Sequence, residues 1–283
     1  MKYRLCAFAD EADPMLPGQI AAMERNGIRL LEIRGVDGEN ISVLSPAKVK
    51  QVAALLADNG LAVWSIGSPT GKIKLSDDFH AHVESFKGML DASAVLGAKA
   101  FRMFSFYEAQ EEKDEVIDRL GILCDLAKGY GVKLCHENEK GIFGDTPERT
   151  RQLLDALPQL GGIFDPANFI QCGAEILPAW ELLKDRIDYL HVKDATRDGT
   201  VVPAGCGVGS LETVVTDFLS RGGEVLTLEP HLADFVGLHG LEQEGERTVL
   251  GSAKFSFRDN NHAFDTAVDS LKTILNRSGA VAL

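Results

Sequence analysis

Four side chains with metal-binding chemistry follow apolar segments in the second half of the chain. They are Glu137, Asp165, His191 and Glu229, and each stands at or near the end of a short run rich in β-branched and aliphatic residues. Three carboxylates and one imidazole form a hard, oxygen-rich donor set. Such a set suits Mn²⁺ or Mg²⁺ and can accept Co²⁺ or Zn²⁺. The residue types therefore predict one divalent cation bound by these four side chains.

A cation bound in this way supports proton transfer next to a carbonyl group. When a proton is removed from the carbon beside a carbonyl, a divalent ion stabilises the enediolate through two adjacent oxygens. A carboxylate within hydrogen-bond reach takes the proton, and a second acid on the opposite face returns one. Two glutamates can do both if one starts protonated. Crowding with Asp165 is expected to raise the pKa of that glutamate.

Short apolar segments alternate with longer amphipathic ones along the chain, which predicts eight strand–helix units. The predicted strands are Tyr3–Ala9, Ile28–Arg34, Leu61–Ile66, Lys99–Phe104, Val132–Glu137, Gly161–Asp165, Ile187–Val192 and Glu224–Glu229. The predicted helices are 14–26, 46–59, 77–96, 112–130, 146–157, 175–184, 210–221 and 263–276.

Unbroken alternation over residues 1–283 predicts a single domain, a closed (β/α)8 TIM barrel. An open doubly wound sheet would carry a glycine-rich turn after its first strand, but Phe8–Ala12 holds no glycine. Functional side chains of such barrels lie at the C-terminal ends of the strands. The four candidate ligands should therefore meet at one end. The long segment 231–262 follows the last predicted strand, and we expect it to cover the site or to contact a second subunit.

Composition excludes several classes of protein. The 283 residues include 29 basic and 42 acidic side chains, for a net charge of −13, which disfavours nucleic acids and anionic membranes as partners. No apolar run approaches the roughly 20 residues that a membrane span needs, and the N-terminal segment lacks the pattern of a signal peptide. The five cysteines form no CxxC pair. Reduced thiols in a cytoplasmic protein are the expectation.

The motifs at the strand ends are also familiar as a set. HEN at 136–138, FDPAN at 164–168, HVKDA at 191–195 and LEPH at 228–231 resemble the sugar phosphate isomerase/epimerase group of the xylose isomerase-like superfamily, and the resemblance spans essentially the whole chain. It implies a TIM barrel whose single divalent cation is bound by the same four side chains. It also implies that Glu137 and Glu229 act as the acid/base pair. Cys206 stands where this family usually has a glutamate between two glycines.

Further polar residues near the strand ends are candidates for binding substrate. Lys193 shares a strand face with His191 and should point at substrate oxygens, unless it is a solvated loop residue. For Arg34 and Arg102, the alternative role is an ion pair inside the barrel. A glycine-rich loop, Gly205–Gly209, either cradles a phosphate or forms a tight turn. The substrate-binding candidates are Glu32, Arg34, Arg102, Asn168, Lys193 and His231.

The resemblance and the chemistry together predict a metal-dependent isomerase or epimerase acting on a small sugar or polyhydroxy ketone. Two alternatives remain open: an inosose-type dehydratase on the same metal site, and a non-catalytic sugar-binding barrel. An apurinic-site endonuclease would need a histidine-rich zinc cluster and a basic face, and seven histidines with a net charge of −13 argue against it. The expected partner is a small carbohydrate, with a homodimer or homotetramer as the expected assembly.

Overall fold

A closed barrel of eight parallel strands forms the centre of the molecule in the computed structural model, which describes residues 1–238 and 255–283. Strand β1 (Lys2–Ala7) pairs with β2 (Leu30–Ile33) on one side and with β12 (Val225–Leu228) on the other, and this second pairing closes the barrel. The remaining barrel strands are β5 (Ala62–Ile66), β6 (Ala100–Met103), β7 (Lys133–Glu137), β8 (Gly161–Phe164) and β9 (Ile187–Val192). The predicted (β/α)8 barrel is confirmed.

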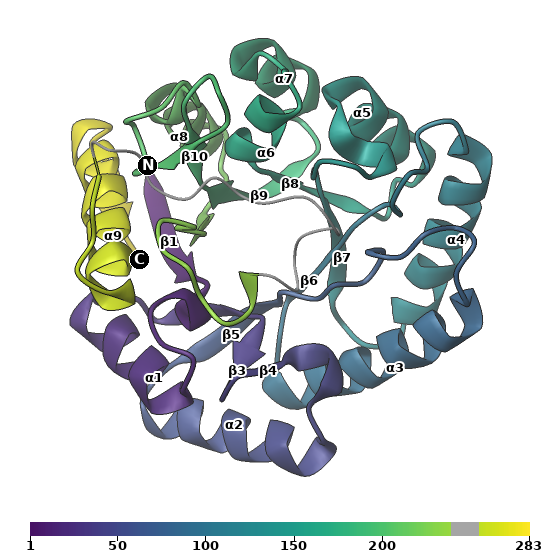
Figure 1. Ribbon diagram of the computed structural model, residues 1–283, viewed down its shortest axis with the longest axis horizontal. Coiled ribbons are helices and arrows are strands. Elements are labelled where there is room, and N and C mark those ends of the chain that lie inside the picture. The colour runs from purple at the N-terminus through teal and green to yellow at the C-terminus, as the bar shows by residue number, and fades with distance from the viewer. Residues whose placement is uncertain (239–254) are drawn as a thin grey trace.

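A ring of helices surrounds the strands (Figure 1). Local signals in the sequence set several of their ends. The Ser45 hydroxyl accepts a hydrogen bond from the Lys48 amide at the start of α2, and Gly97 ends α3 in the left-handed conformation. The helices are α1 (Leu16–Arg25), α2 (Pro46–Asp58), α3 (Phe79–Leu96), α4 (Lys113–Ala127), α5 (Pro147–Ala156), α6 (Pro166–Gln171), α7 (Ile176–Leu183), α8 (Leu211–Ser220) and α9 (Asn260–Arg277).

Helix α6 was not predicted, although its signals are in the sequence. The Asp165 carboxylate caps it by accepting from the Asn168 amide at 3.0 Å, and Pro166 occupies its first turn. The prediction from sequence places only a strand end in this stretch. Two short antiparallel ribbons and one added strand also escaped prediction, because two-residue strands carry no periodicity. They are β3 (Gly35–Val36) with β4 (Glu39–Asn40), β10 (Asp194–Ala195) with β11 (Val201–Val202), and β13 (Val281–Ala282) beside β1.

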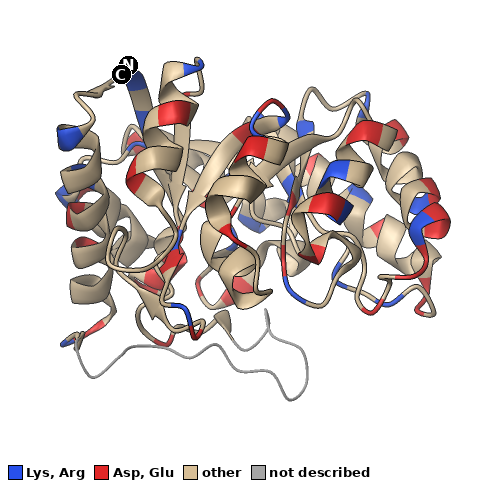
Figure 2. Ribbon diagram, turned by 90° about the horizontal axis from the view of Figure 1, so that it is seen from above, with Lys and Arg blue, Asp and Glu red and all other residues tan. Residues whose placement is uncertain are grey.

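The inside of the barrel is apolar at one end and polar at the other. Residues two apart on a strand face the same side, so several inward residues of the apolar layer are followed, two positions along the strand, by a polar residue that faces the same way. Cys135 lies below Glu137, Ile163 below Asp165 and Tyr189 below His191 on this rule. The apolar layer consists of Cys6, Ala100, Cys135, Ile163, Tyr189 and Val225, with Leu30 and Trp64 packed against it. This layer closes the end where the strands begin, where both chain termini also lie (Figure 2).

The segment 231–262 is described only in part, because residues 239–254 lie outside the described residues. On its near side Phe235 and Leu238 are buried, and the Phe235 ring stacks on His231 with the centroids 5.4 Å apart. The lid or subunit contact predicted for 231–262 stays a prediction, as does the assignment of residues 1–283 to one domain. Among the helices of the described ranges, none has the length and hydropathy that crossing a membrane requires.

Barrel closure gives a stability prediction. Leu226 in β12 is fully buried and lies between β1 and β9. Leu226→Ala should lower the free energy of unfolding by about 2–5 kcal/mol, because it removes buried methyl groups and leaves a cavity. Leu177→Ala on the surface of α7, where the leucine is 45% exposed, should change it by less than about 0.5 kcal/mol. Urea unfolding followed by circular dichroism measures both, and equal effects would contradict the prediction.

Candidate metal centre

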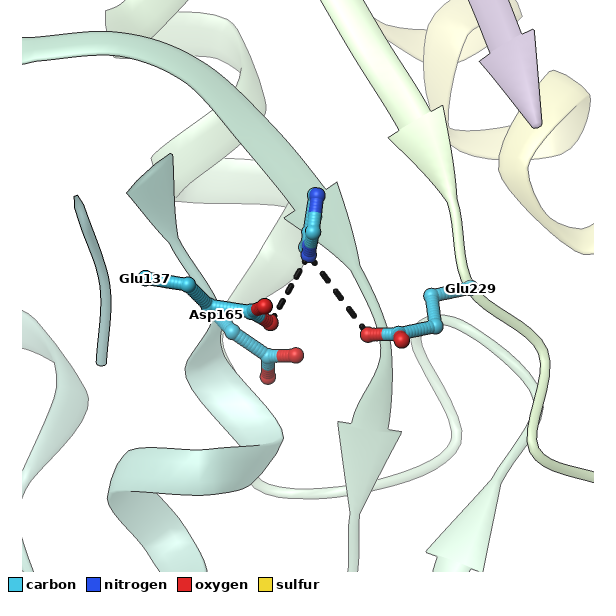
Figure 3. Close-up of side chains that lie close together, drawn as sticks. Glu137, Asp165 and Glu229 are labelled. Atoms are coloured by element: carbon cyan, nitrogen blue, oxygen red, sulfur yellow. Dashed lines mark hydrogen bonds and ion pairs between the residues drawn. The ribbon is translucent and has the colours of Figure 1, made fainter. Parts of the chain in front are cut away.

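The four predicted ligands converge at the C-terminal end of the barrel, and one ligand atom from each lies within 4.8 Å of all the others. Glu137 and Glu229 approach from opposite sides, and Asp165 lies beside Glu137 (Figure 3). His191 joins them: its Nδ1 is 2.8 Å from Glu137 Oε1 and 3.5 Å from Glu229 Oε2. All four side chains are buried. A buried cluster of this composition suggests a divalent metal.

The carboxylate of Asp165 is oriented by its own backbone and by the neighbouring strand. Asn138, the residue after β7, donates from Nδ2 to the Asp165 carbonyl and accepts from the Asp165 amide, both at 2.9 Å. Asn168 in α6 donates to the Asn138 carbonyl at 2.9 Å and approaches Glu137 Oε1 at 3.4 Å. Asn168, predicted to bind substrate, therefore contacts one candidate ligand and the backbone beside it.

Glu32 lies behind His191 rather than above the cluster. Its Oε2 is 3.1 Å from His191 Nε2, while its Oε1 accepts from the hydroxyls of Ser65 at 3.2 Å and Tyr189 at 3.1 Å. A carboxylate on Nε2 fixes the ring so that Nδ1 faces the cluster. Burial opposes protonation of His191, but Glu137 and Glu32 outweigh it and raise the His191 pKa well above its usual value.

The three carboxylates of the cluster titrate differently. Burial raises the pKa of Asp165 to about 7. The negative charges of Glu229 and Glu137 add to the rise, and the positive charge of Lys193 opposes it. Burial also acts on Glu229, but Lys193 and the nearby histidines hold its pKa well below the usual value. The pKa of Glu137 is lowered too, because the positive charges of His191 and Arg102 outweigh the effect of burial. The expectation of a glutamate with a raised pKa is wrong, because the positive charges beside both glutamates outweigh burial and crowding.

Three predicted substrate-binding residues supply those basic groups. Lys193 Nζ lies 2.9 Å from Asp165 Oδ2 and 3.0 Å from Glu229 Oε2, so Lys193 points into the site as its strand face predicted. Arg102 donates to Glu137 Oε2 at 3.1 Å, and Arg34 donates to Glu229 Oε1 at 3.2 Å. All three side chains are buried. The ion pairs weighed as an alternative role for the arginines are present.

Sequence reasoning missed two acidic residues of this network. Asp10 and Glu11 follow β1 in a short 3-10 turn (Ala9–Glu11), and both carboxylates pair with Arg34 at 2.9 and 3.1 Å. The second Glu11 oxygen accepts from the His231 amide at 2.6 Å, which helps to hold His231 at a φ of 44°. The signal was available: two acidic residues end the first strand, as Glu137 ends the fifth.

His231 lies at the wall of the same site. Its Nε2 is 3.5 Å from Glu11 Oε1 and 3.6 Å from Glu229 Oε1. Burial and the positive charge of Lys193 lower its pKa well below the usual value. All ten predicted site residues thus fall within one contact network, although their roles stay predictions.

The backbone amides of the loop Gly205–Gly209 bind the Asp194 carboxylate of the same chain. Asp194 accepts hydrogen bonds from the amides of Gly205, Gly207 and Gly209 at 2.9–3.0 Å. A Cβ on Gly207 would lie 2.3 Å from the Asp194 carboxylate, so only glycine fits there. These donors are used for a turn, the second of the two roles considered for this loop. Cys206 is exposed on its outer side.

The charges of this network fit a divalent cation. Six buried carboxyl groups share it with three basic side chains and His191. Buried carboxylates in excess are costly without further positive charge. The acidic members are Asp10, Glu11, Glu32, Glu137, Asp165 and Glu229.

The closed eight-stranded barrel places this chain in the class of TIM barrels, and the cluster at its strand ends suggests a divalent metal. The particular family follows from the sequence match: a model of the xylose isomerase-like TIM barrel family matches residues 20–234. The chain belongs to that family.

Individual relatives are more distant. The chain is 22% identical over 202 residues to a 3-dehydroshikimate dehydratase of Bacillus anthracis, which covers 69% of this chain and 72% of the relative. Among solved structures, the IolI protein with a bound zinc atom superposes with a TM-score of 0.73, at 18% identity and 97% and 99% coverage. An L-ribulose 3-epimerase superposes with a TM-score of 0.71, at 18% identity and 99% and 96% coverage. These structural likenesses show the shared fold.

Asp165→Asn tests the cluster as a metal site. The amide keeps the oxygen that caps α6 but loses the charge, so wild type should retain about one equivalent of Mn²⁺ after removal of excess ion and the variant much less. Elemental analysis measures the content. Asp188→Asn is the matched control, because Asp188 pairs with Lys133 near the start of β9, away from the cluster. Equal metal in wild type and Asp165→Asn would rule out this ligand.

Metal binding should also depend on pH. Asp165, with a pKa of about 7, and His191, with a raised pKa, hold protons that a cation must displace. The apparent affinity should therefore rise between about pH 6 and about pH 8, by up to about tenfold per pH unit for each proton released. Isothermal titration calorimetry in buffers of different ionisation enthalpy counts the protons. An affinity that does not change over this range would contradict the assignment.

Proposed function

We propose that this protein is a metal-dependent isomerase or epimerase acting on a small sugar or polyhydroxy ketone by proton transfer beside the carbonyl carbon. The observation that carries the proposal is the placement of Glu137 and Glu229 on opposite sides of one buried cluster (Figure 3). One glutamate removes a proton from one face of the substrate, and the opposite face is reprotonated on the side of the other glutamate. We propose Glu137, Asp165, His191 and Glu229 as the metal ligands.

The cation that best suits three carboxylates and one imidazole is Mn²⁺ or Mg²⁺, with Co²⁺ or Zn²⁺ as substitutes. When bound, it would supply positive charge to the carbonyl and neighbouring hydroxyl oxygens, which lowers the cost of removing the proton. Glu32, through its contact with Nε2, keeps His191 Nδ1 turned toward the cluster, where it would bind the ion.

Proton supply at this site comes from Lys193. The pKa of both glutamates lies below its usual value, because Lys193, His191 and Arg102 pair with them. The Lys193 ammonium, 3.0 Å from Glu229 Oε2, is a proton-bearing neighbour on the Glu229 side. We assign Glu137 and Glu229 to acid/base chemistry, Lys193 to protonation on the Glu229 side, and Arg34 to fixing Glu229.

A second candidate is a dehydratase on the same cluster. It shares the removal of a proton beside the carbonyl but then expels a β-hydroxyl, and the Lys193 ammonium can protonate that leaving group. The observation in its favour is the relative named 3-dehydroshikimate dehydratase. The two candidates differ in what happens after the shared first step.

One experiment separates them. The Mn²⁺-loaded protein is incubated in D₂O with a panel of ketoses, aldoses, inososes and 3-dehydroshikimate, followed by proton NMR and mass spectrometry. An isomerase or epimerase incorporates solvent deuterium beside the carbonyl without loss of mass to water. A dehydratase yields a product lighter by one water. No exchange with any compound would favour the non-catalytic sugar-binding barrel.

Glu229→Gln should keep the fold and abolish turnover, with a loss of at least about 10²-fold, the lower range for a lost acid/base group. Glutamine keeps the shape but neither carries the charge nor accepts the proton. The matched control is Glu224→Gln, at the start of the same strand on the surface, where the glutamate pairs with the exposed Arg4. Near-normal turnover by Glu229→Gln on the true substrate would remove Glu229 from the mechanism.

A further inference from the structure

The cavity that leads to the metal cluster is lined by more basic than acidic side chains, in a chain whose net charge is −13. Its basic residues are Lys72, Arg102, Lys140 and Lys193, and its acidic ones are Glu139 and Glu229. Arg102 and Lys193 already balance the carboxylates of the cluster. Lys72 and Lys140 lie farther out, so the charge at the mouth is not explained by the metal ligands.

Lys72 is held in place by its backbone. It belongs to the loop between β5 and α3, where Phe104 donates to the Thr70 carbonyl at 2.8 Å and Phe106 to the Gly71 carbonyl at 2.9 Å. Gly71 has a φ of 89°, and a Cβ there would lie 2.2 Å from the Phe104 carbonyl oxygen. Only glycine allows this close approach. The loop therefore presents the next residue, Lys72, from a fixed position.

The Lys72 side chain is buried along the wall of the cavity. Its exposed fraction is 6%, against 48% for Lys74 two residues on. Its ammonium lies 4.5 Å from the centre of the Phe104 ring and 3.2 Å from Glu139 Oε2. Burying a lysine is costly unless its charge is paired, and here the pairing partner is a carboxylate at the cavity wall. Glu139 is the more exposed partner at 18% and can turn to solvent when another anion takes its place.

We propose that the substrate carries an anionic group, a phosphate or a carboxylate, and that Lys72 binds this group at the mouth of the metal cavity. The inference rests on the proposed function for what happens to the substrate, but it concerns only recognition. The reacting carbonyl faces the cluster, and the charged end lies outward against Lys72 and Lys140. The positive mouth also attracts anionic substrates toward an otherwise acidic protein.

The test uses three ketoses that differ only at carbon six: D-fructose, D-fructose 6-phosphate and D-fructuronate, a carboxylate. Their dissociation constants for the Mn²⁺-loaded full chain are measured by isothermal titration calorimetry. The anionic ketose that fits should bind at least about tenfold more tightly than D-fructose, the effect of one charge-assisted hydrogen bond. Whichever of the two shows this preference identifies the group.

Three variants separate Lys72 from general charge effects and from direct binding of the anion to Mn²⁺. In Lys72→Gln, the ratio of the affinity for the anionic ketose to the affinity for D-fructose should fall close to one. Lys74→Gln removes the same charge from the same loop, where Lys74 pairs with the exposed Glu108 outside the cavity, and should leave the preference unchanged. Glu139→Gln removes the competing carboxylate and should tighten binding of the anionic ketose severalfold. A gain of affinity cannot come from misfolding.

Equal affinity for all three ketoses, no measurable binding of any, or equal effects of Lys72→Gln and Lys74→Gln would each overturn the inference. Failure of the proposed function gives a different pattern. The Lys72-dependent preference would then be present, but no ketose would take up deuterium from solvent. Deuterium uptake from D-fructose without any anion preference would leave the proposed function standing and remove the anionic site.

Discussion

The cost of placing several carboxylates together in a dry barrel end is the constraint that organises this protein. Glu137, Asp165 and Glu229 lie within one small cluster with almost no access to water, where like charges repel strongly and hydration is lost. Each carboxylate therefore has a partner. Arg102 pairs with Glu137, Arg34 with Glu229, and Lys193 bridges Asp165 and Glu229. These pairs explain why so many charged side chains can be buried together.

The same constraint divides the roles of the surrounding groups. A basic side chain that pairs with a glutamate favours its carboxylate form. That form can bind a metal or accept a proton, but it cannot donate one. Asp165 and Glu11 are exceptions, since burial raises their pKa values to about 7 and about 8. Behind the cluster, Glu32 and Tyr189 fix His191 from below. The lower half of the barrel is therefore structural, and what differs between reactions must lie above the cluster.

The rim of the cavity is where substrate selection would occur. Isomerisation, epimerisation and dehydration share the removal of a proton beside a carbonyl, so one cluster serves all three. Substrates must be told apart by contacts farther out, and there the loop between β5 and α3 holds Lys72 beside Glu139. In TIM barrels the loops after the strands carry such differences while the strands keep the chemistry.

The sequence by itself determined the barrel and the identity of the cluster. Alternating strand and helix periods require eight similar units, and strand ends of a closed barrel must meet, so Glu137, Asp165, His191 and Glu229 could be grouped without coordinates. Sequence did not determine which side chains neutralise them. Arg34, Asp10 and Glu11 come together from the ends of the neighbouring strands β2 and β1, and Lys72 reaches the cavity only through the path of its loop. Pairing and burial depend on distances between segments far apart in the chain, and pKa values follow from both. Only the tertiary structure decides them.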